Sequence, residues 1–244
     1  MIDLHSHIIP NIDDGSRSME MSLTMARQSV AAGVTHVVCT PHMHWGVFDN
    51  TQETIEAGFQ QLTDAVADAQ IPLALSWAAE VRLKEYIPQW LREDRLPFIG
   101  RHNGRPVLLL EMPHSHVPAG VEPLVRYLRA QGVQPLLPHP ERNRDILKMP
   151  EKIPWLRNLG CWLQVTAGAI TGRFGENVQA LVTEMLAQEQ VDVVASDMHD
   201  DTRRPTDMRE AYDQVSTHLG EDYAQKLFVN TPADIIAEQP TIQP

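Results

Sequence analysis

The chain has 244 residues, with 32 acidic and 20 basic side chains and a formal charge of -12 at pH 7. This acidic balance excludes a protein that binds nucleic acid through a general basic surface, and it argues against docking on an anionic membrane. A hydrophobic content of 43% is enough to form a core at this length. The two cysteines exclude a disulfide scaffold, whereas the 11 histidines favour metal chemistry.

The N-terminal sequence enters a polar motif at once, without a basic stretch followed by an apolar one, so no secretory signal is visible. No apolar run reaches the roughly 18 residues that a bilayer span requires. We therefore expect a cytoplasmic location without membrane insertion. No linker or repeat divides the chain, which predicts a single domain over residues 1–244, with residues 239–244 as a loose tail.

Seven apolar runs predict strands, taken in chain order at residues 2–4, 34–39, 73–81, 107–110, 135–138, 161–165 and 191–195. Amphipathic segments predict helices at residues 18–32, 51–69, 121–131, 176–188 and 207–219. Strands that are apolar on both faces and alternate with helices are typical of a parallel sheet covered by helices. Seven such units favour an α/β barrel of the TIM type, (β/α)7, with outer helices, over an open sheet.

Metal-ligand residue types follow six of these seven runs; they are His5, His7, His42, Glu80, Glu111, His139, Asp197 and His199. In a parallel barrel, all strand ends of one kind meet on one face, where such folds place their sites. A single histidine after a strand is usually an ordinary loop residue, but six occupied strand ends make coincidence a poor explanation. Carboxylates gathered there would also repel one another unless cations neutralised them.

Several motifs resemble the polymerase and histidinol phosphatase (PHP) superfamily. They resemble most closely its bacterial manganese-dependent protein-tyrosine phosphatases, which are encoded with capsular or exopolysaccharide genes. The resemblance runs from Asp3 to about Pro205. Its motifs are His5-Ser6-His7 followed by Asp13-Asp14-Gly15, then Thr40-Pro41-His42, Ala79-Glu80-Val81-Arg82, His139-Pro140-Glu141-Arg142-Asn143 and Ser196-Asp197-Met198-His199. It implies a distorted (β/α)7 barrel of PHP type.

The resemblance also implies a site for three divalent ions, with Mn²⁺ expected and iron or zinc compatible with the same ligands. His5, His7, Glu80 and Asp197 would bind the first ion. Glu80 would bridge to a second ion, which Glu111 and His139 complete, and Asp14, His42 and His199 would hold the third. Arg142 and Arg204 resemble the phosphate-contacting arginines of the family, with Arg203 as the alternative to Arg204.

The implied activity is hydrolysis of phosphotyrosine by a metal-activated hydroxide, without a phosphorylated enzyme intermediate. The implied substrate is the phosphotyrosine tail of a bacterial tyrosine autokinase that controls polysaccharide synthesis. One alternative is a PHP phosphatase of a small molecule such as histidinol phosphate. Another is a non-catalytic, metal-bound regulatory module that binds the kinase. The oligomeric state stays open, a homo-oligomer included.

For the other candidate residues, the sequence predicts a less specific role. A cysteine phosphatase needs an arginine six positions after its thiolate, and neither Cys39 nor Cys161 has one, so both are expected to be core thiols. His114 and His116 are expected to contact substrate or line the rim more than to bind metal. The role of His44 stays open, and Trp45 either borders the pocket or packs in the fold.

Overall fold

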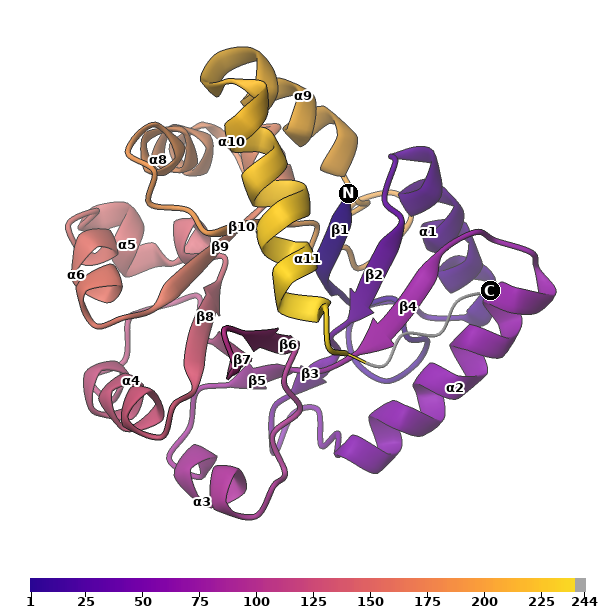
Figure 1. Ribbon diagram of the computed structural model, residues 1–244, viewed down its shortest axis with the longest axis horizontal. Coiled ribbons are helices and arrows are strands. Elements are labelled where there is room, and N and C mark those ends of the chain that lie inside the picture. The colour runs from indigo at the N-terminus through magenta and orange to yellow at the C-terminus, as the bar shows by residue number, and fades with distance from the viewer. Residues whose placement is uncertain (240–244) are drawn as a thin grey trace.

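The computed structural model describes residues 1–239 and contains two parallel sheets surrounded by helices (Figure 1). The three-stranded sheet has the order β1 (Ile2–Ser6), β2 (His36–Cys39) and β4 (Ala74–Trp77). The second sheet has the order β10 (Val193–Ala195), β9 (Trp162–Thr166), β8 (Gln134–Pro138), β7 (Arg105–Glu111), β5 (Glu80–Arg82) and β3 (His42–Met43). Strand β6 (Gly100–His102) pairs antiparallel with β7. The predicted parallel α/β architecture is confirmed.

The two sheets are joined at both sides. Strand β2 leads directly into β3, and β4 leads into β5, so each of these two chain segments contributes to both sheets. On the other side, the amide of His7 donates to the carbonyl of Met198 at 2.9 Å, and the amide of Asp197 donates to the carbonyl of His5 at 2.9 Å. Seven strand segments therefore follow one another as in an interrupted barrel.

The prediction of one continuous strand over residues 73–81 is wrong. The run divides into β4 and β5, because Ala78 donates to the carbonyl of Cys39 and Glu80 donates to the carbonyl of Pro41. Ala78 and Ala79 are both fully buried. Their small side chains let the chain turn between the sheets, and the turn carries Glu80 into register with His42.

The five predicted helices are present within one or two residues of their expected ends. They are α1 (Met19–Ala31), α2 (Gln52–Asp68), α4 (Val121–Ala130), α8 (Glu176–Ala187) and α9 (Met208–Leu219). Local capping explains two of the starts: the Ser18 hydroxyl accepts from the amide of Met21, and Thr51 and Thr54 form a reciprocal capping box.

The sequence reading did not foresee the shorter elements. These are α3 (Ile87–Arg92), a 3₁₀ turn (Pro140–Arg142), α5 (Arg144–Lys148), α6 (Lys152–Asn158), α7 (Ala167–Ile170), α10 (Glu221–Gln225), a π-helical turn (Lys226–Asn230) and α11 (Thr231–Ile236). Helix α11 crosses in front of the strands in Figure 1. Its Ile235 packs with Leu4, Val38, Ile99 and Val107 in a buried apolar cluster.

The strand ends on the side opposite α11 carry the polar residues that are predicted to bind metal. Two of these residues, His139 after β8 and Asp197 after β10, have left-handed backbones with φ of 38° and 50°. Such conformations are costly for residues other than glycine and collect at functional sites. None of the helices in residues 1–239 is long and apolar enough to cross a membrane. The predicted loose tail lies outside the described residues from position 240 onward.

Candidate metal centre

The structure brings all nine predicted ligands together at the carboxyl ends of the strands. Eight of them, with His114, form four overlapping groups in which the potential ligand atoms lie within 4.8 Å of one another. The groups are His5, His7 and Glu80; His42, Glu80 and Glu111; Glu111, His114 and His139; and His7, Asp14, His42 and His199. Asp197, the ninth, lies 3.4 Å from both His5 and His7. Residues far apart in sequence thus form one continuous centre.

His5 and His7 lie at the bottom of this centre and are fully buried. His5 Nδ1 lies 2.7 Å from Oε1 of Gln164, and His7 Nδ1 lies 2.7 Å from Oδ2 of Asp13. Nε2 of Gln164 donates to the carbonyl of Val165 at 2.9 Å, so Oε1 is the amide atom that faces His5. Each Nδ1 can therefore donate to its oxygen, so that Nε2 is the ring atom that faces the centre. Burial opposes protonation, but the nearby carboxylates outweigh it and raise the pKa of both imidazoles, and a bound cation would replace the proton on each Nε2.

The two Nε2 atoms of His5 and His7 lie only 3.2 Å apart. Oε2 of Glu80 lies 3.4 Å from both of them and 2.8 Å from Nδ1 of His42, so three imidazole nitrogens surround this buried oxygen. Lone pairs and carboxylate oxygens facing one another in a buried space repel unless a cation lies between them. This donor set therefore fits a divalent metal ion with nitrogen and oxygen ligands.

Around Glu80, the donors of the second predicted ion are also in place. His139 Nε2 lies 2.8 Å from Oε1 of Glu80, and burial lowers the pKa of His139 to about 3, which keeps its imidazole neutral. Burial, together with the negative charge of Glu80, raises the pKa of Glu111 to about 7. Arg82 holds the other side of Glu111 through a 2.7 Å ion pair. Neutral imidazole beside crowded carboxylates is what a cation would stabilise.

The third group is the most open part of the centre. His199 Nδ1 lies 2.9 Å from the carbonyl oxygen of Asp197, so Nε2 is directed to Asp14, whose Oδ1 lies 3.6 Å away. His42 Nε2 lies 3.4 Å from the same Asp14 oxygen. The side chain of Asp14 is 54% exposed, whereas those of His42 and His199 are 14% and 6% exposed. This group therefore faces the solvent from which a substrate arrives.

Both predicted arginines contact the centre through Asp197. Arg142 and Arg204 each pair with Oδ2 of Asp197, Arg204 at 2.6 Å. Burial opposes ionisation of Asp197, but Arg204 and the neighbouring histidines outweigh it and hold the pKa of this carboxyl well below its usual range. The Arg142 guanidinium also lies 4.4 Å from the ring centroid of Phe174. Two fixed guanidinium groups at the edge of a metal centre can bind phosphoryl oxygens.

The remaining candidate residues, for which no specific role is predicted, lie partly inside and partly outside the metal centre. His114 lies within ligand distance of Glu111 and His139, although the sequence favoured a rim position for it. His44 belongs to none of the four groups found among the described residues. Trp45 is 56% exposed, which argues against a packing role. Cys39 and Cys161 are both buried free thiols. Burial raises the pKa of Cys161 to about 12, so it is an inert thiol.

Sequence reasoning missed three residues that hold the ligands: Asp13, Arg82 and Gln164. Asp13 and Arg82 lie inside motifs that carry the family resemblance, beside Asp14 and Glu80. Gln164 lies in the sixth strand, which supplies no predicted ligand. A polar residue inside an otherwise apolar strand is the signal that could have identified it, since a buried amide needs hydrogen-bond partners.

Comparison with known proteins agrees with this geometry. The chain is 31% identical to the tyrosine-protein phosphatase YwqE of Bacillus subtilis over 99% of this chain and 93% of that protein. It is 28% identical to the tyrosine-protein phosphatase CpsB of Streptococcus pneumoniae, over 98% and 99% of the two chains.

Among solved structures, one described as that of YwqE from Bacillus subtilis and CpsB from Streptococcus pneumoniae, unique metal-dependent tyrosine phosphatases, superposes with a TM-score of 0.90. That match is 30% identical and covers 100% of this chain and 97% of the other. The family model for capsular polysaccharide synthesis, CpsB/CapC, matches residues 1–237. The chain therefore belongs to the CpsB/CapC family, which confirms the predicted family.

Proposed function

We propose that this protein is a metal-dependent protein-tyrosine phosphatase that acts on the phosphotyrosine tail of a bacterial tyrosine kinase in capsular or exopolysaccharide synthesis. The single observation that supports the chemistry best is the pair of Nε2 atoms of His5 and His7, which lie 3.2 Å apart beside Glu80 in a fully buried space. The relatives named tyrosine-protein phosphatase support the substrate class. We further propose that the whole chain works as one PHP-type domain. The cytoplasmic location stays a prediction.

The ligands are assigned to three ions in this proposal. The first would be bound by His5, His7, Glu80 and Asp197; the second by Glu80, Glu111 and His139; and the third by Asp14, His42 and His199. Oxygen and nitrogen donors without thiolate favour Mn²⁺, and iron or zinc fits the same set. When bound, such ions supply positive charge for phosphoryl oxygens and lower the pKa of water at the site.

The chain's own residues bind and orient the substrate. Arg142 and Arg204 offer planar, forked donors to the phosphoryl oxygens, which carry about two negative charges at neutral pH. Asp197 fixes both guanidinium groups before the substrate arrives. Donors set in place in advance stabilise the charge of the transition state without reorganisation. Because the thiols of Cys39 and Cys161 are buried, the phosphoryl group is transferred without a cysteine nucleophile.

Metal content and phosphatase activity of the purified protein test the proposal. We expect hydrolysis of a phosphotyrosine peptide that a chelator abolishes and Mn²⁺ restores. His139→Ala should lose metal and activity together. Arg142→Ala should retain metal but lose about 100-fold in kcat, the typical loss for one preorganised donor. Arg144→Ala is the matched control, because Arg144 is an exposed arginine two positions away. It should leave both quantities unchanged.

Each of the following outcomes would contradict a different part of the proposed function. Equal kinetics for Arg142→Ala and Arg144→Ala would remove Arg142 from the phosphate site. Faster turnover of histidinol phosphate than of the peptide would favour the small-molecule alternative. Metal-loaded protein that binds the kinase tail without hydrolysing it would favour the regulatory alternative.

A further inference from the structure

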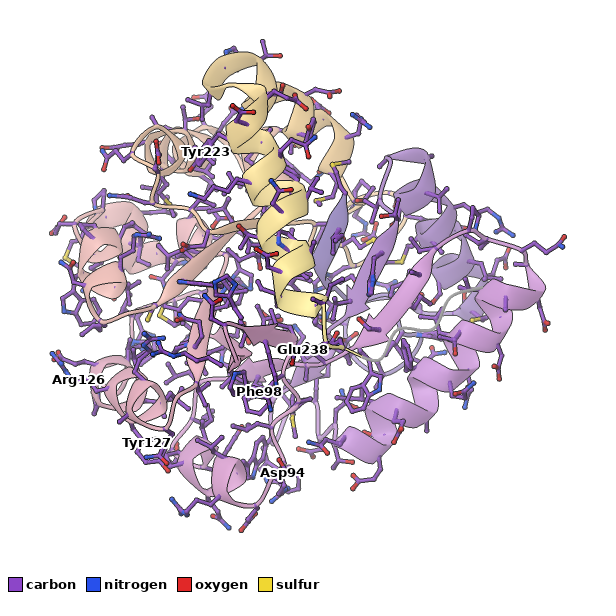
Figure 2. The ribbon with its side chains drawn as sticks, viewed as in Figure 1. Asp94, Phe98, Arg126, Tyr127, Tyr223 and Glu238 are labelled. Atoms are coloured by element: carbon purple, nitrogen blue, oxygen red, sulfur yellow. The ribbon has the colours of Figure 1, made fainter. Side chains whose placement is uncertain are left out.

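Helices α3 and α4 enclose a groove on the outer wall of the fold. Its volume is about 520 Å³, and its lining is mostly apolar, with Leu83, Pro88, Pro118, Pro123, Leu124 and Tyr127 as the main contributors. Figure 2 places Tyr127 on α4, beside α3. Lys84 and Glu85 are the charged residues of the groove.

Each wall of the groove contains a residue from a segment that follows a strand end at the metal centre. On one side, Leu83 follows Arg82, which pairs with Glu111, and the amide of Leu83 donates to the carbonyl of Glu111 at 2.8 Å. On the other side, Pro118 belongs to the segment after Glu111. That segment also contains His114, whose ring centroid lies 4.7 Å from that of His139. The groove therefore adjoins the metal centre through Leu83, which lines the groove and is hydrogen-bonded to Glu111.

We propose that the α3–α4 groove binds the polypeptide on one side of the phosphotyrosine, as an extended segment with apolar side chains. This inference rests on the proposed phosphatase function, because it assigns a peptide to the surface next to the same site. The apolar lining selects apolar flanking residues, since burying them there removes both surfaces from water. An open groove also suits a flexible chain, which can lie along it without a conformational change of the enzyme.

The groove would let this enzyme distinguish a peptide from a small phosphate ester. The metals and arginines bind the phosphoryl group, which every aryl phosphate contains. Contacts outside the reacting group contribute only when the substrate is long enough to reach them. We therefore expect the groove to lower KM for peptides and to leave small aryl phosphates unaffected.

Gly120 offers a way to fill the groove without disturbing the core. It lines the groove at the start of α4, has a φ of -77° and would have no atom within 4 Å of an added Cβ. Gly120→Trp should raise KM for a phosphotyrosine peptide with apolar flanks by about ten-fold, a typical loss for one anchoring contact. Its kcat/KM for p-nitrophenyl phosphate should stay within about two-fold, because that ester does not extend beyond the phosphate site.

Arg126→Trp is the matched control. Arg126 lies on the same helix, is 66% exposed, contacts Glu122 and points away from the molecule in Figure 2. This variant adds the same side chain outside the groove and should leave both substrates unaffected. Shortening the peptide from one end only should abolish the difference between Gly120→Trp and the unmodified enzyme, because only one flank occupies the groove.

Three outcomes would contradict the groove assignment or the phosphatase function. If the unmodified protein hydrolyses the peptide and Gly120→Trp has the same KM, the groove does not bind substrate although the phosphatase function stands. If the unmodified, metal-loaded protein hydrolyses neither substrate, the proposed function itself fails. An equal loss on peptide and on p-nitrophenyl phosphate would indicate damage to the phosphate site and would also overturn the groove assignment.

Discussion

Gln164 shows how a neutral side chain can control a metal ligand. Its amide is fixed by donating to the carbonyl of Val165, and its oxygen then accepts from Nδ1 of His5. This contact directs Nε2 of His5 to the centre, where a cation would replace its proton. Asp13 does the same for His7 with a charged oxygen, which makes that imidazole the more basic of the two.

Replacing Gln164 should therefore weaken metal binding selectively. We expect Gln164→Leu to lower the Mn²⁺ affinity by about 10- to 100-fold, the usual effect of removing a hydrogen-bond partner of a ligand. Gln164→Glu keeps an acceptor for Nδ1 and should restore most of the affinity, even though it loses the bond to Val165. Competition with a chelating dye measures the affinity without reference to activity.

Gln134→Leu is the control for this substitution. Gln134 is also a buried strand glutamine whose Nε2 donates to the next carbonyl, that of Pro135, at 3.0 Å, but it lies at the start of β8, away from the ligands. Both leucine variants should lose similar stability. Equal Mn²⁺ affinity in the two variants would show that Gln164 only stabilises the fold.

Sequence reasoning predicted eight of the nine candidate ligands from their place at the ends of apolar runs, where a parallel fold exposes its residues, and Asp14 from the family resemblance alone. It could not identify the partner of His5, because Gln164 is separated from it by 159 positions and only the assembled sheet joins them. It also could not choose between Arg203 and Arg204 with certainty. The structure supports Arg204, which reaches Asp197, whereas Arg203 is exposed.

At the scale of elements, a close contact between two backbones determines which substitutions a strand tolerates. Gly100, in β6, has a φ of 146°, and a Cβ there would lie 2.0 Å from the carbonyl oxygen of Ile235 in α11. Gly104 lies in the turn between β6 and β7 with a φ of 76° and open space around it. The main difference between the two glycines is that α11 covers Gly100, whereas Gly104 faces open space.

This difference predicts unequal effects of alanine. Gly104→Ala should lower the free energy of unfolding by about 1 kcal/mol, the cost of a left-handed alanine. Gly100→Ala should cost about 3 kcal/mol or more, because α11 must also move away from β6. Urea unfolding of both variants measures the two costs. Equal costs would mean that the docking of α11 does not depend on Gly100.

His36 in β2 predicts a pH dependence that is separate from the metal centre. Its Nε2 lies 2.9 Å from the Ser76 hydroxyl of β4, and burial lowers the pKa of His36 from an ordinary 6.5 to about 4. The unfolded chain therefore binds a proton at a higher pH than the folded one. The contribution of the neutral imidazole is complete above pH 6.5 and is lost as the pH falls toward 4.

Comparison with His36→Gln isolates this contribution. Between pH 8 and pH 5, the unmodified protein should lose about 2 kcal/mol more unfolding free energy than the variant. The other titrating groups are common to both proteins and cancel in the difference. Parallel loss of stability in both proteins over this range would show that His36 is protonated in the fold.

The sequence does not reveal where a predicted strand divides into two. An apolar run over 73–81 favours one strand, because every residue in it can be buried on either face. The turn at Ala78 and Ala79 depends on hydrogen bonds to Cys39 and Pro41, which belong to a neighbouring segment. Periodicity describes the environment of a residue but carries no information about which sheet supplies its partner.

At the scale of the whole molecule, the bound ions would change the balance of charge. Three divalent ions would halve the formal charge of -12, and they would do so at one end of the strands. The global acidity therefore says little about the site, where Arg142 and Arg204 add to the positive charge. An anionic phosphate can be attracted to that end even though the rest of the surface is acidic.

Ion binding should also stabilise the fold as a unit. Saturation of one site at 100 times its Kd contributes about 2.7 kcal/mol, which corresponds to a rise in Tm of about 5–10 °C for a chain of this size. We expect Mn²⁺ to raise Tm by at least that amount over the chelated protein and to raise it less in His139→Ala. A Tm that is independent of Mn²⁺ would contradict a centre built from the buried ligands.

Helix α11 has a consequence for the synthesis of the protein. It covers one end of the strands and buries Ile235 against Leu4 of β1, so almost the last part of the described chain packs on the first. During translation, β1 leaves the ribosome before its cover, which is made more than 200 residues later. The apolar end of the strands therefore stays open on a nascent chain until α11 has emerged. Folding can be completed only after that point, and a chain truncated before α11 would expose a surface that favours aggregation.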